Sequence, residues 1–127
     1  AETPGVILTG FQTGQKLKAL FSQARLFVIP SYHEGLPIAL LEAMSFSLPA
    51  IMSNIPANLE VSLPSEGYFE VGNVAALAAK LSQYQSASDI DYSDYLKKYD
   101  WYLIARQTMY VYQEIFQNNT FDIPSHI

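Results

Sequence analysis

The feature that most constrains the fold is an apolar run followed by a loop and an amphipathic stretch, PSYHEGLPIALLEAM, at residues 30–44. The run Leu26–Ile29 before it is unbroken, which is typical of a short parallel strand buried on both faces. Pro37 is acceptable in the first turn of a helix, because its missing N–H would have no helical partner there. After it, apolar residues recur at the spacing of one helix face, at Ile38, Leu41 and Met44. We therefore expect a strand, a loop and then a helix over residues 36–46.

The rest of the chain repeats this alternation. Strands are expected at 6–9, 50–52 and 67–71, a turn or short helix at 54–59, and further helices at 14–24, 74–84, 91–99 and 101–117. Strands that alternate with helices indicate an α/β, Rossmann-like parallel sheet with flanking helices. Ligands bind such sheets outside the carboxyl ends of the strands. Three loops fall at those ends: 10–12, 31–35 and 53–60.

Two carboxylates bracket the start of the central helix. Glu34 and Glu42 are eight positions apart, and if that stretch is near-helical they are separated by roughly 12 Å along the axis. Their angular offset is then only about 80°, so that both can line one side of a cleft. Such a span is about the length of a nucleotide diphosphate with a sugar attached.

Composition excludes several classes of protein. Apolar residues make up 50% of the chain and form no long uninterrupted run, so we expect neither disorder nor a membrane span. A net charge of −5 argues against a nucleic-acid partner, since phosphate binding requires basic patches. The sequence has no cysteine, and it has no recognisable signal peptide, metal cluster or glycine-rich phosphate loop. We expect a cytoplasmic protein without a bound metal or cofactor.

Charged residues make up only 15% of the chain, below the usual quarter or so. Two interpretations stay open. The surface is rich in uncharged polar residues, or part of it is covered by another domain or by the inner face of a membrane.

The segment EGLPIALLEAM resembles the donor-binding signature of retaining GT-B glycosyltransferases (group 1, family 4 type). Its Glu-x7-Glu spacing follows a PS strand end and precedes a small-residue run and a proline. GYFEVGNVAALAAKL resembles the family's next strand and helix, and YDW its entry to the closing helix. The resemblance covers residues 6–116.

The resemblance implies transfer of a sugar, with retention and without a metal, from a nucleotide-sugar to a glycan or lipid-linked acceptor in polysaccharide biosynthesis. It places Glu34 against the transferred sugar, as the catalytic candidate, and Glu42 on the ribose hydroxyls. The predicted donor site also contains Ser31, Gly35, Leu36, Pro37, Ile38, Phe11, Gln12 and Glu60. Free backbone N–H groups near residues 36–38, at the positive end of the helix dipole, would suit a phosphate.

The chain also departs from the family pattern. Residues 1–127 match only part of the C-terminal donor domain, and we expect the two opening strand–helix units and the N-terminal acceptor domain to be absent. The fragment is then inactive alone, and its exposed sheet edge allows dimerisation. Residues 26–79 contain five glutamates but no lysine or arginine to meet a diphosphate. Ser47 and the pair Ala57–Asn58 stand where the family has glycines.

Simpler interpretations accompany each candidate. Glu34 can be a solvated loop carboxylate, Glu42 a buried carboxylate with a structural hydrogen bond, and Gly35 a turn residue. Phe11 and Gln12 can be ordinary loop residues, and His33 lacks an evident acid–base or metal partner. The tyrosines of the last third fit packing better than a sugar platform. At the level of the protein, a sugar-nucleotide epimerase fragment and a non-catalytic α/β interaction module remain alternatives.

Overall fold

The computed structural model describes residues 3–84 and 90–118, with the side chain of residue 118 left out. The chain divides into two compact units, Ala1–Ser93 and Asp94–Ile127, which are described separately below. His126 and the polar stretch 85–88, which the sequence assigns to a tail and a loop, lie outside the described residues.

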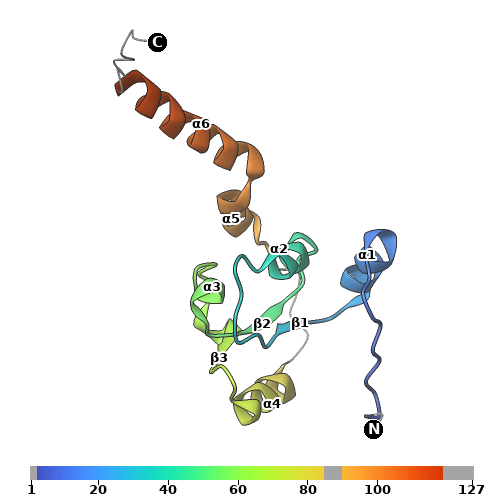
Figure 1. Ribbon diagram of the computed structural model, residues 1–127. Helices are drawn as coiled ribbons and strands as arrows, with labels where there is room; N and C mark the ends of the chain where they lie inside the picture. The colour runs from blue at the N-terminus through green and yellow to red at the C-terminus, as the bar shows by residue number, and fades with distance from the viewer. Residues whose placement is uncertain (1–2, 85–89, 119–127) are drawn as a thin grey trace, which may run out of the picture. The chain divides into compact units, whose positions relative to one another are not determined.

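The first unit is organised around a parallel sheet of three strands in the order β1-β2-β3 (Figure 1). The strands are β1 (Phe27–Ile29), β2 (Ala50–Ser53) and β3 (Tyr68–Phe69). Val28 pairs with Ile51 across β1 and β2, and Met52 pairs with Tyr68 across β2 and β3. Since every pair is parallel and each connection contains a helix, the α/β fold expected from the sequence is confirmed.

Helix α2 (Ile38–Ser45) connects β1 to β2 and supplies much of the core. The helix begins two residues later than predicted, and Pro37 is its N-cap instead of a first-turn residue. Its buried residues are Leu40, Ala43 and Met44, whereas Ile38 is 58% exposed. The helical period was therefore predicted correctly, and Met44 lies on the buried face as the spacing indicates, with Leu41 half-buried. The inward side is rotated away from Ile38 toward Leu40 and Ala43, because the packing of α2 on the sheet sets which side faces inward.

Ser47 ends α2 in a Schellman motif. Its φ is 55°, its N–H donates to the carbonyl of Met44, and the N–H of Leu48 donates to the carbonyl of Ala43. This left-handed conformation favours glycine, because a Cβ crowds the following carbonyl. The serine at this position therefore occupies a backbone geometry in which glycine would be less strained.

The remaining connections follow the prediction closely. They are α3 (Pro56–Leu59), the 3-10 turn η1 (Ser65–Gly67) and α4 (Val74–Gln83). The side chain of Asn73 caps α4 by accepting a hydrogen bond from the N–H of Ala76, at 2.9 Å. In Figure 1, α2 and α4 lie on opposite sides of the sheet. The spacing of Leu77, Ala78 and Leu81 predicts that they face inward on α4, but they are only half-buried or exposed, so this helix contributes little to the core.

The segment before β1 differs most from expectation. Residues 6–9 form no strand, and Leu8 is 93% exposed. A strand needs a hydrogen-bonded neighbour, and within residues 3–84 and 90–118 no strand pairs with this segment. Helix α1 (Gly14–Gln23) follows, with Thr13 at its N-cap but without a side-chain capping bond. The spacing of Leu17, Leu20 and Phe21 predicts an inward stripe on α1, but none of its residues is fully buried.

Helix α1 is connected to the rest of the unit through one aromatic ring. The ring of Phe21 stacks on that of Phe46, with centroids 5.6 Å apart, and lies 5.9 Å from that of Phe27. Aromatic pairs at these separations are attractive. Phe21 thereby joins α1 to β1 and to the end of α2.

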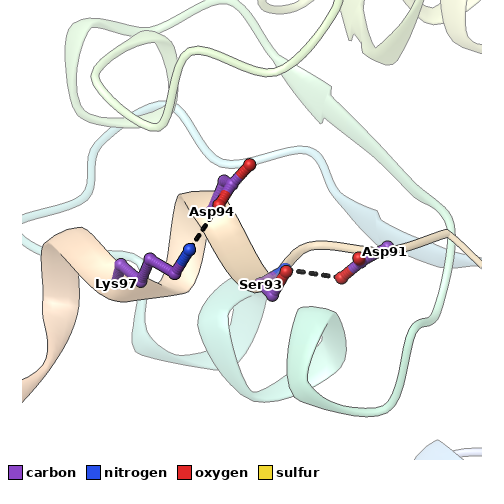
Figure 2. Close-up of polar contacts among 4 residues, drawn as sticks. All are labelled: Asp91, Ser93, Asp94 and Lys97. Carbon is purple, nitrogen blue, oxygen red and sulfur yellow. Dashed lines mark hydrogen bonds and ion pairs between the residues drawn. The ribbon is translucent and has the colours of Figure 1, made fainter.

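The second unit consists of most of α5 (Ser93–Leu96), the 3-10 turn η2 (Lys97–Tyr99) and α6 (Trp101–Asn118). An aspartate directly before a predicted helix, as at Asp100, predicts an N-cap. The structure confirms it, because Asp100 Oδ1 accepts hydrogen bonds from the N–H groups of Tyr102 and Leu103 at the start of α6. Figure 2 shows the Lys97 Nζ–Asp94 Oδ1 ion pair, at 2.6 Å. It also shows a local turn in the first unit, where the N–H of Ser93 donates to Asp91 Oδ1. Of the helices in the described ranges, none is both long and apolar enough to cross a membrane.

Candidate functional site

The loop after β1 holds the first of the two predicted acids. The hydroxyl of Ser31 donates to Glu34 Oε1 at 2.6 Å, and both side chains are half-buried. A hydrogen bond to a carboxylate is shorter and stronger than a neutral one. In the part of the chain that the structure describes, Oε2 of Glu34 accepts no hydrogen bond. The carboxylate is thus held from one side while its second oxygen remains available to a ligand.

The same loop is attached to the end of β2. The hydroxyl of Ser53, which is fully buried, donates to the backbone carbonyl of Ser31 at 2.6 Å. Asn58 on α3 is also fully buried, and its Nδ2 donates to the carbonyl of Ser53 at 2.9 Å and to its Oγ at 3.2 Å. A continuous set of hydrogen bonds therefore runs from α3 through β2 to the loop that carries Glu34.

Asn58 is fixed by a further contact. Its backbone carbonyl accepts a hydrogen bond from the hydroxyl of Tyr68, which in turn accepts one from the N–H of Leu63. Its Oδ1 is buried and has no hydrogen-bond partner among the described residues. Neither Ser53 nor Asn58 was predicted as a site residue, although both lie in the predicted loop 53–60 and Asn58 stands where the family has a glycine. The available signals were this loop position and a serine at the end of the apolar run Ala50–Met52. Burial of Asn58 could not be predicted from the sequence.

Gly35, next to Glu34, has no conformational reason to be glycine. Its φ is outside the left-handed region, and a Cβ built on it would meet nothing within 4 Å. Gly72 differs, because its φ is +76° and a Cβ would lie 3.4 Å from the ring of Tyr32. The chain bends at Gly35, but its φ does not require glycine, and open space surrounds the place where a Cβ would lie.

The start of α2 offers fewer free donors than the sequence predicts. Pro37 has no N–H, and the N–H of Ile38 donates to the carbonyl of Leu36 at 2.8 Å. The carbonyl of Pro37 accepts from Leu40 and Leu41. Of the backbone N–H groups expected to be free near residues 36–38, that of Ile38 is therefore already used, and Pro37 contributes none. Leu36 and Ile38 expose their side chains, whereas Pro37 is buried.

The second acid lies in the middle of α2. Glu42 is exposed, on a helix whose buried face is formed by other residues, so its interpretation as a buried structural carboxylate is wrong. Residues 34–37 are not helical, and the roughly 12 Å helical separation estimated between the acids does not apply. The hydroxyl of Ser45 donates to the backbone carbonyl of Glu42 at 2.6 Å and leaves the carboxylate unused.

The other predicted site residues are less constrained. Phe11 is 94% exposed, and Gln12 donates through Nε2 to the carbonyl of Thr9. Glu60 is exposed at the end of α3. The hydrogen bonds of the site connect Ser31 and Glu34 to each other but do not reach these three residues or Glu42. Their predicted roles remain predictions.

The stretch of chain that contains the site carries acidic side chains and no basic ones other than histidine. Because residues 26–79 contain no lysine or arginine, the first cation after β3 is Lys80, and its Nζ donates to the carbonyl of Glu66 at 2.7 Å. His33 is exposed, and in residues 3–84 and 90–118 no three histidine, aspartate or glutamate side chains group as metal ligands would. A diphosphate at this site would need positive charge from outside this stretch.

Comparison with known proteins gives a consistent picture. The family model described as glycosyl transferases group 1 matches residues 3–99. The GDP-mannose:cellobiosyl-diphosphopolyprenol alpha-mannosyltransferase of Xanthomonas oryzae pv. oryzae is 35% identical over 97 residues, which is 68% of this chain and 25% of that protein. The O-antigen chain mannosyltransferase B of Escherichia coli is 34% identical over 74 residues, 58% of this chain and 19% of that protein.

An uncharacterised glycosyltransferase of Methanocaldococcus jannaschii is 29% identical over 119 residues, 85% of this chain and 30% of that protein. No solved structure matches the chain significantly. The matched part of the chain thus spans 19–30% of the length of these three relatives.

Proposed function

Because this chain belongs to the glycosyl transferases group 1 family, we propose that it forms the donor-binding part of a retaining glycosyltransferase. The enzyme transfers a sugar from a nucleotide-sugar to a glycan or lipid-linked acceptor. The observation that carries this proposal is the family match over residues 3–99, which contains the Glu34 loop and α2. A sugar-nucleotide epimerase is not favoured by any observation.

GDP-mannose is the donor to test first, because the Xanthomonas oryzae relative is named for that donor and the Escherichia coli relative is named a mannosyltransferase. In the proposed complex, Glu34 Oε2 contacts the mannose while Ser31 holds Oε1. Glu42, exposed on α2, binds the ribose hydroxyls. The open space above Gly35 admits the donor to the loop.

The leaving diphosphate requires about two positive charges, and a helix N-terminus offers only about half of one. Residues 26–79 supply none, so we propose that cationic side chains outside this stretch complete the site. Transfer needs no metal or other cofactor in this proposal and depends on positioning and on electrostatic stabilisation of the leaving group. The 127-residue chain alone is then inactive, and a lipid-linked acceptor would bring the full-length enzyme to the cytoplasmic face of a membrane.

The test is titration of the full-length protein with GDP-mannose and with GDP. Glu42→Ala should weaken binding of both ligands by roughly 1.5–3 kcal/mol, the range for a hydrogen bond to a charged group. Glu114→Ala is the matched control, since Glu114 is also an exposed helical glutamate but lies on α6.

Two results would contradict the proposal. If the full-length protein binds neither ligand, the non-catalytic interaction module is favoured. If Glu42→Ala changes affinity no more than Glu114→Ala does, the ribose-binding role of Glu42 is wrong.

A further inference from the structure

The hydrogen bonds behind Glu34 form a path with a consistent direction. Asn58 Nδ2 donates to Ser53 Oγ at 3.2 Å, and Ser53 Oγ donates to the carbonyl of Ser31 at 2.6 Å. Ser31 Oγ then donates to Glu34 Oε1 at 2.6 Å. A serine hydroxyl has one proton, so the bond accepted from Asn58 leaves the proton of Ser53 for Ser31. Each donor in the path is thus matched to one acceptor.

The two inner members of this path are unusual in their burial. Ser53 and Asn58 are the polar side chains that are fully buried in the described part of the chain, and each has zero exposure. Burial of a polar group is unfavourable unless hydrogen bonds replace those lost to water. Asn58 meets this condition only in part, because its Oδ1 has no partner in the described residues. An apolar side chain would fill the same space without that loss, so packing alone does not account for an asparagine here.

The path also joins segments that are distant in sequence. Ser53 and Ser31 are 22 positions apart and lie at the ends of the paired strands β2 and β1. The bond between them fixes the backbone at the base of the Glu34 loop. The bond from Ser31 Oγ then fixes the carboxylate itself. The position of the Glu34 carboxylate therefore depends on α3, through hydrogen bonds that include the backbone of Ser31.

We infer that Ser31, Ser53 and Asn58 are positioning residues, which hold the Glu34 carboxylate where it meets the transferred sugar of the donor. This inference rests on the proposed function, since it gives Glu34 a sugar to contact. Such residues influence the contact between Glu34 and the sugar, and they do not influence contacts with the nucleotide. Their loss should consequently change affinity for the nucleotide-sugar and leave affinity for the free nucleotide unchanged.

The experiment measures binding of GDP-mannose and of GDP to the full-length protein by titration calorimetry. Ser31→Ala should weaken GDP-mannose binding roughly tenfold, the lower part of the range for a hydrogen bond to a charged group. It should change GDP binding by less than about twofold, the scatter expected between independent sites. Ser53→Ala should act in the same direction, and Ser31→Thr, which keeps the hydroxyl, should restore GDP-mannose binding. The matched control is Ser22→Ala. Like the hydroxyl of Ser53, that of Ser22 donates to a backbone carbonyl, but the acceptor is Ala19 on α1.

A double-mutant cycle with Glu34→Gln tests whether the path acts through Glu34. In the Glu34→Gln background, Ser31→Ala should weaken GDP-mannose binding by less than about twofold further. An equal loss in both backgrounds, or equal losses for GDP-mannose and GDP, would overturn the inference in favour of a structural role. Asn58→Ala is not used as a test, because removal of a fully buried asparagine can unfold the unit. Ser53→Ala tests the inner part of the path instead.

Failure of the proposed function gives a different pattern. If the unsubstituted protein binds neither ligand, or if Glu34→Gln leaves GDP-mannose binding unchanged, the donor role of Glu34 is wrong and the inference falls with it. If Glu34→Gln weakens GDP-mannose binding but Ser31→Ala and Ser53→Ala do not, only the positioning inference is overturned.

Discussion

Helices α2 and α6 both carry methionine and leucine, but they bury them to very different extents. In α2, Leu40 and Met44 are 0% and 1% exposed, whereas in α6 Leu103 and Met109 are 44% and 55% exposed. A shallow depression along α6 is lined by residues of that helix alone, so it is an open helix face. Both segments form helices because helical preference and capping act locally. Only packing against the sheet turns the apolar residues of α2 into a core.

The largest expected effect tests this contrast directly. Met44→Ala should reduce the free energy of unfolding of the sheet unit by about 2–5 kcal/mol, because it leaves a cavity in a filled core. Met109→Ala, the same substitution in α6, should change stability by no more than about 0.5 kcal/mol, as is usual for exposed positions. Denaturant titration of the full-length protein, followed by hydrogen exchange of β2 and α6 amides, measures both. Equal losses would mean that α6 is as closely packed as α2.

Helix caps should behave alike in the two regions, since capping is local. Asn73→Ala at the start of α4 and Asp100→Ala at the start of α6 should each cost about 1 kcal/mol. Thr13→Ala is the control, because Thr13 precedes α1 without making a capping bond. Hydrogen exchange of the first-turn amides of each helix gives the values. A loss at only one of the two caps would show that capping depends on burial.

Ser47→Gly should stabilise the sheet unit. A left-handed conformation costs an L-residue roughly 1–2 kcal/mol, and glycine removes this strain. The greater conformational freedom of glycine in the unfolded chain offsets roughly 0.5–1 kcal/mol of the gain. We expect a net gain of about 0.5–1 kcal/mol, measured as a raised unfolding midpoint. Ser45→Gly, at the last residue of α2, is the control and should lower the midpoint, because Ser45 has a helical backbone, in which glycine is less favourable than serine.

The smallest effect is expected at the ion pair of the second unit. Lys97 and Asp94 leave 72% and 86% of their side chains exposed, so their attraction is screened by water. Lys97→Ala should therefore change stability by less than about 0.5 kcal/mol. The control is Lys98→Ala, at an exposed neighbouring lysine that forms no ion pair with the described residues of the second unit, and it should give a similar value in thermal unfolding. A loss above 1 kcal/mol for Lys97 alone, at roughly the upper limit for such pairs, would contradict this.

Several elements of the fold were predictable from local patterns. The short strands at Phe27–Ile29 and Ala50–Ser53 and the caps at Asn73 and Asp100 were found, because apolar runs and capping residues act over a few positions. The strand at residues 6–9 was predicted wrongly, although three of its four residues are as apolar as those of β1. Apolar character alone does not make a strand, because the backbone also needs a neighbour with which to pair.

The features of the candidate site also divide into those that the sequence predicts and those that only the structure shows. The sequence by itself determined that an acid-bearing loop precedes an amphipathic helix. It also determined the family of the chain, through the motif that contains Glu34 and Glu42. Only the tertiary structure decided that α2 begins at Ile38, that Glu42 is exposed, and that Ser53 and Asn58 lie behind Glu34. Helical period and capping depend on near neighbours in the chain. Burial and hydrogen bonds between residues 22 positions apart depend on how the strands pair, and strand pairing is a property of the folded chain.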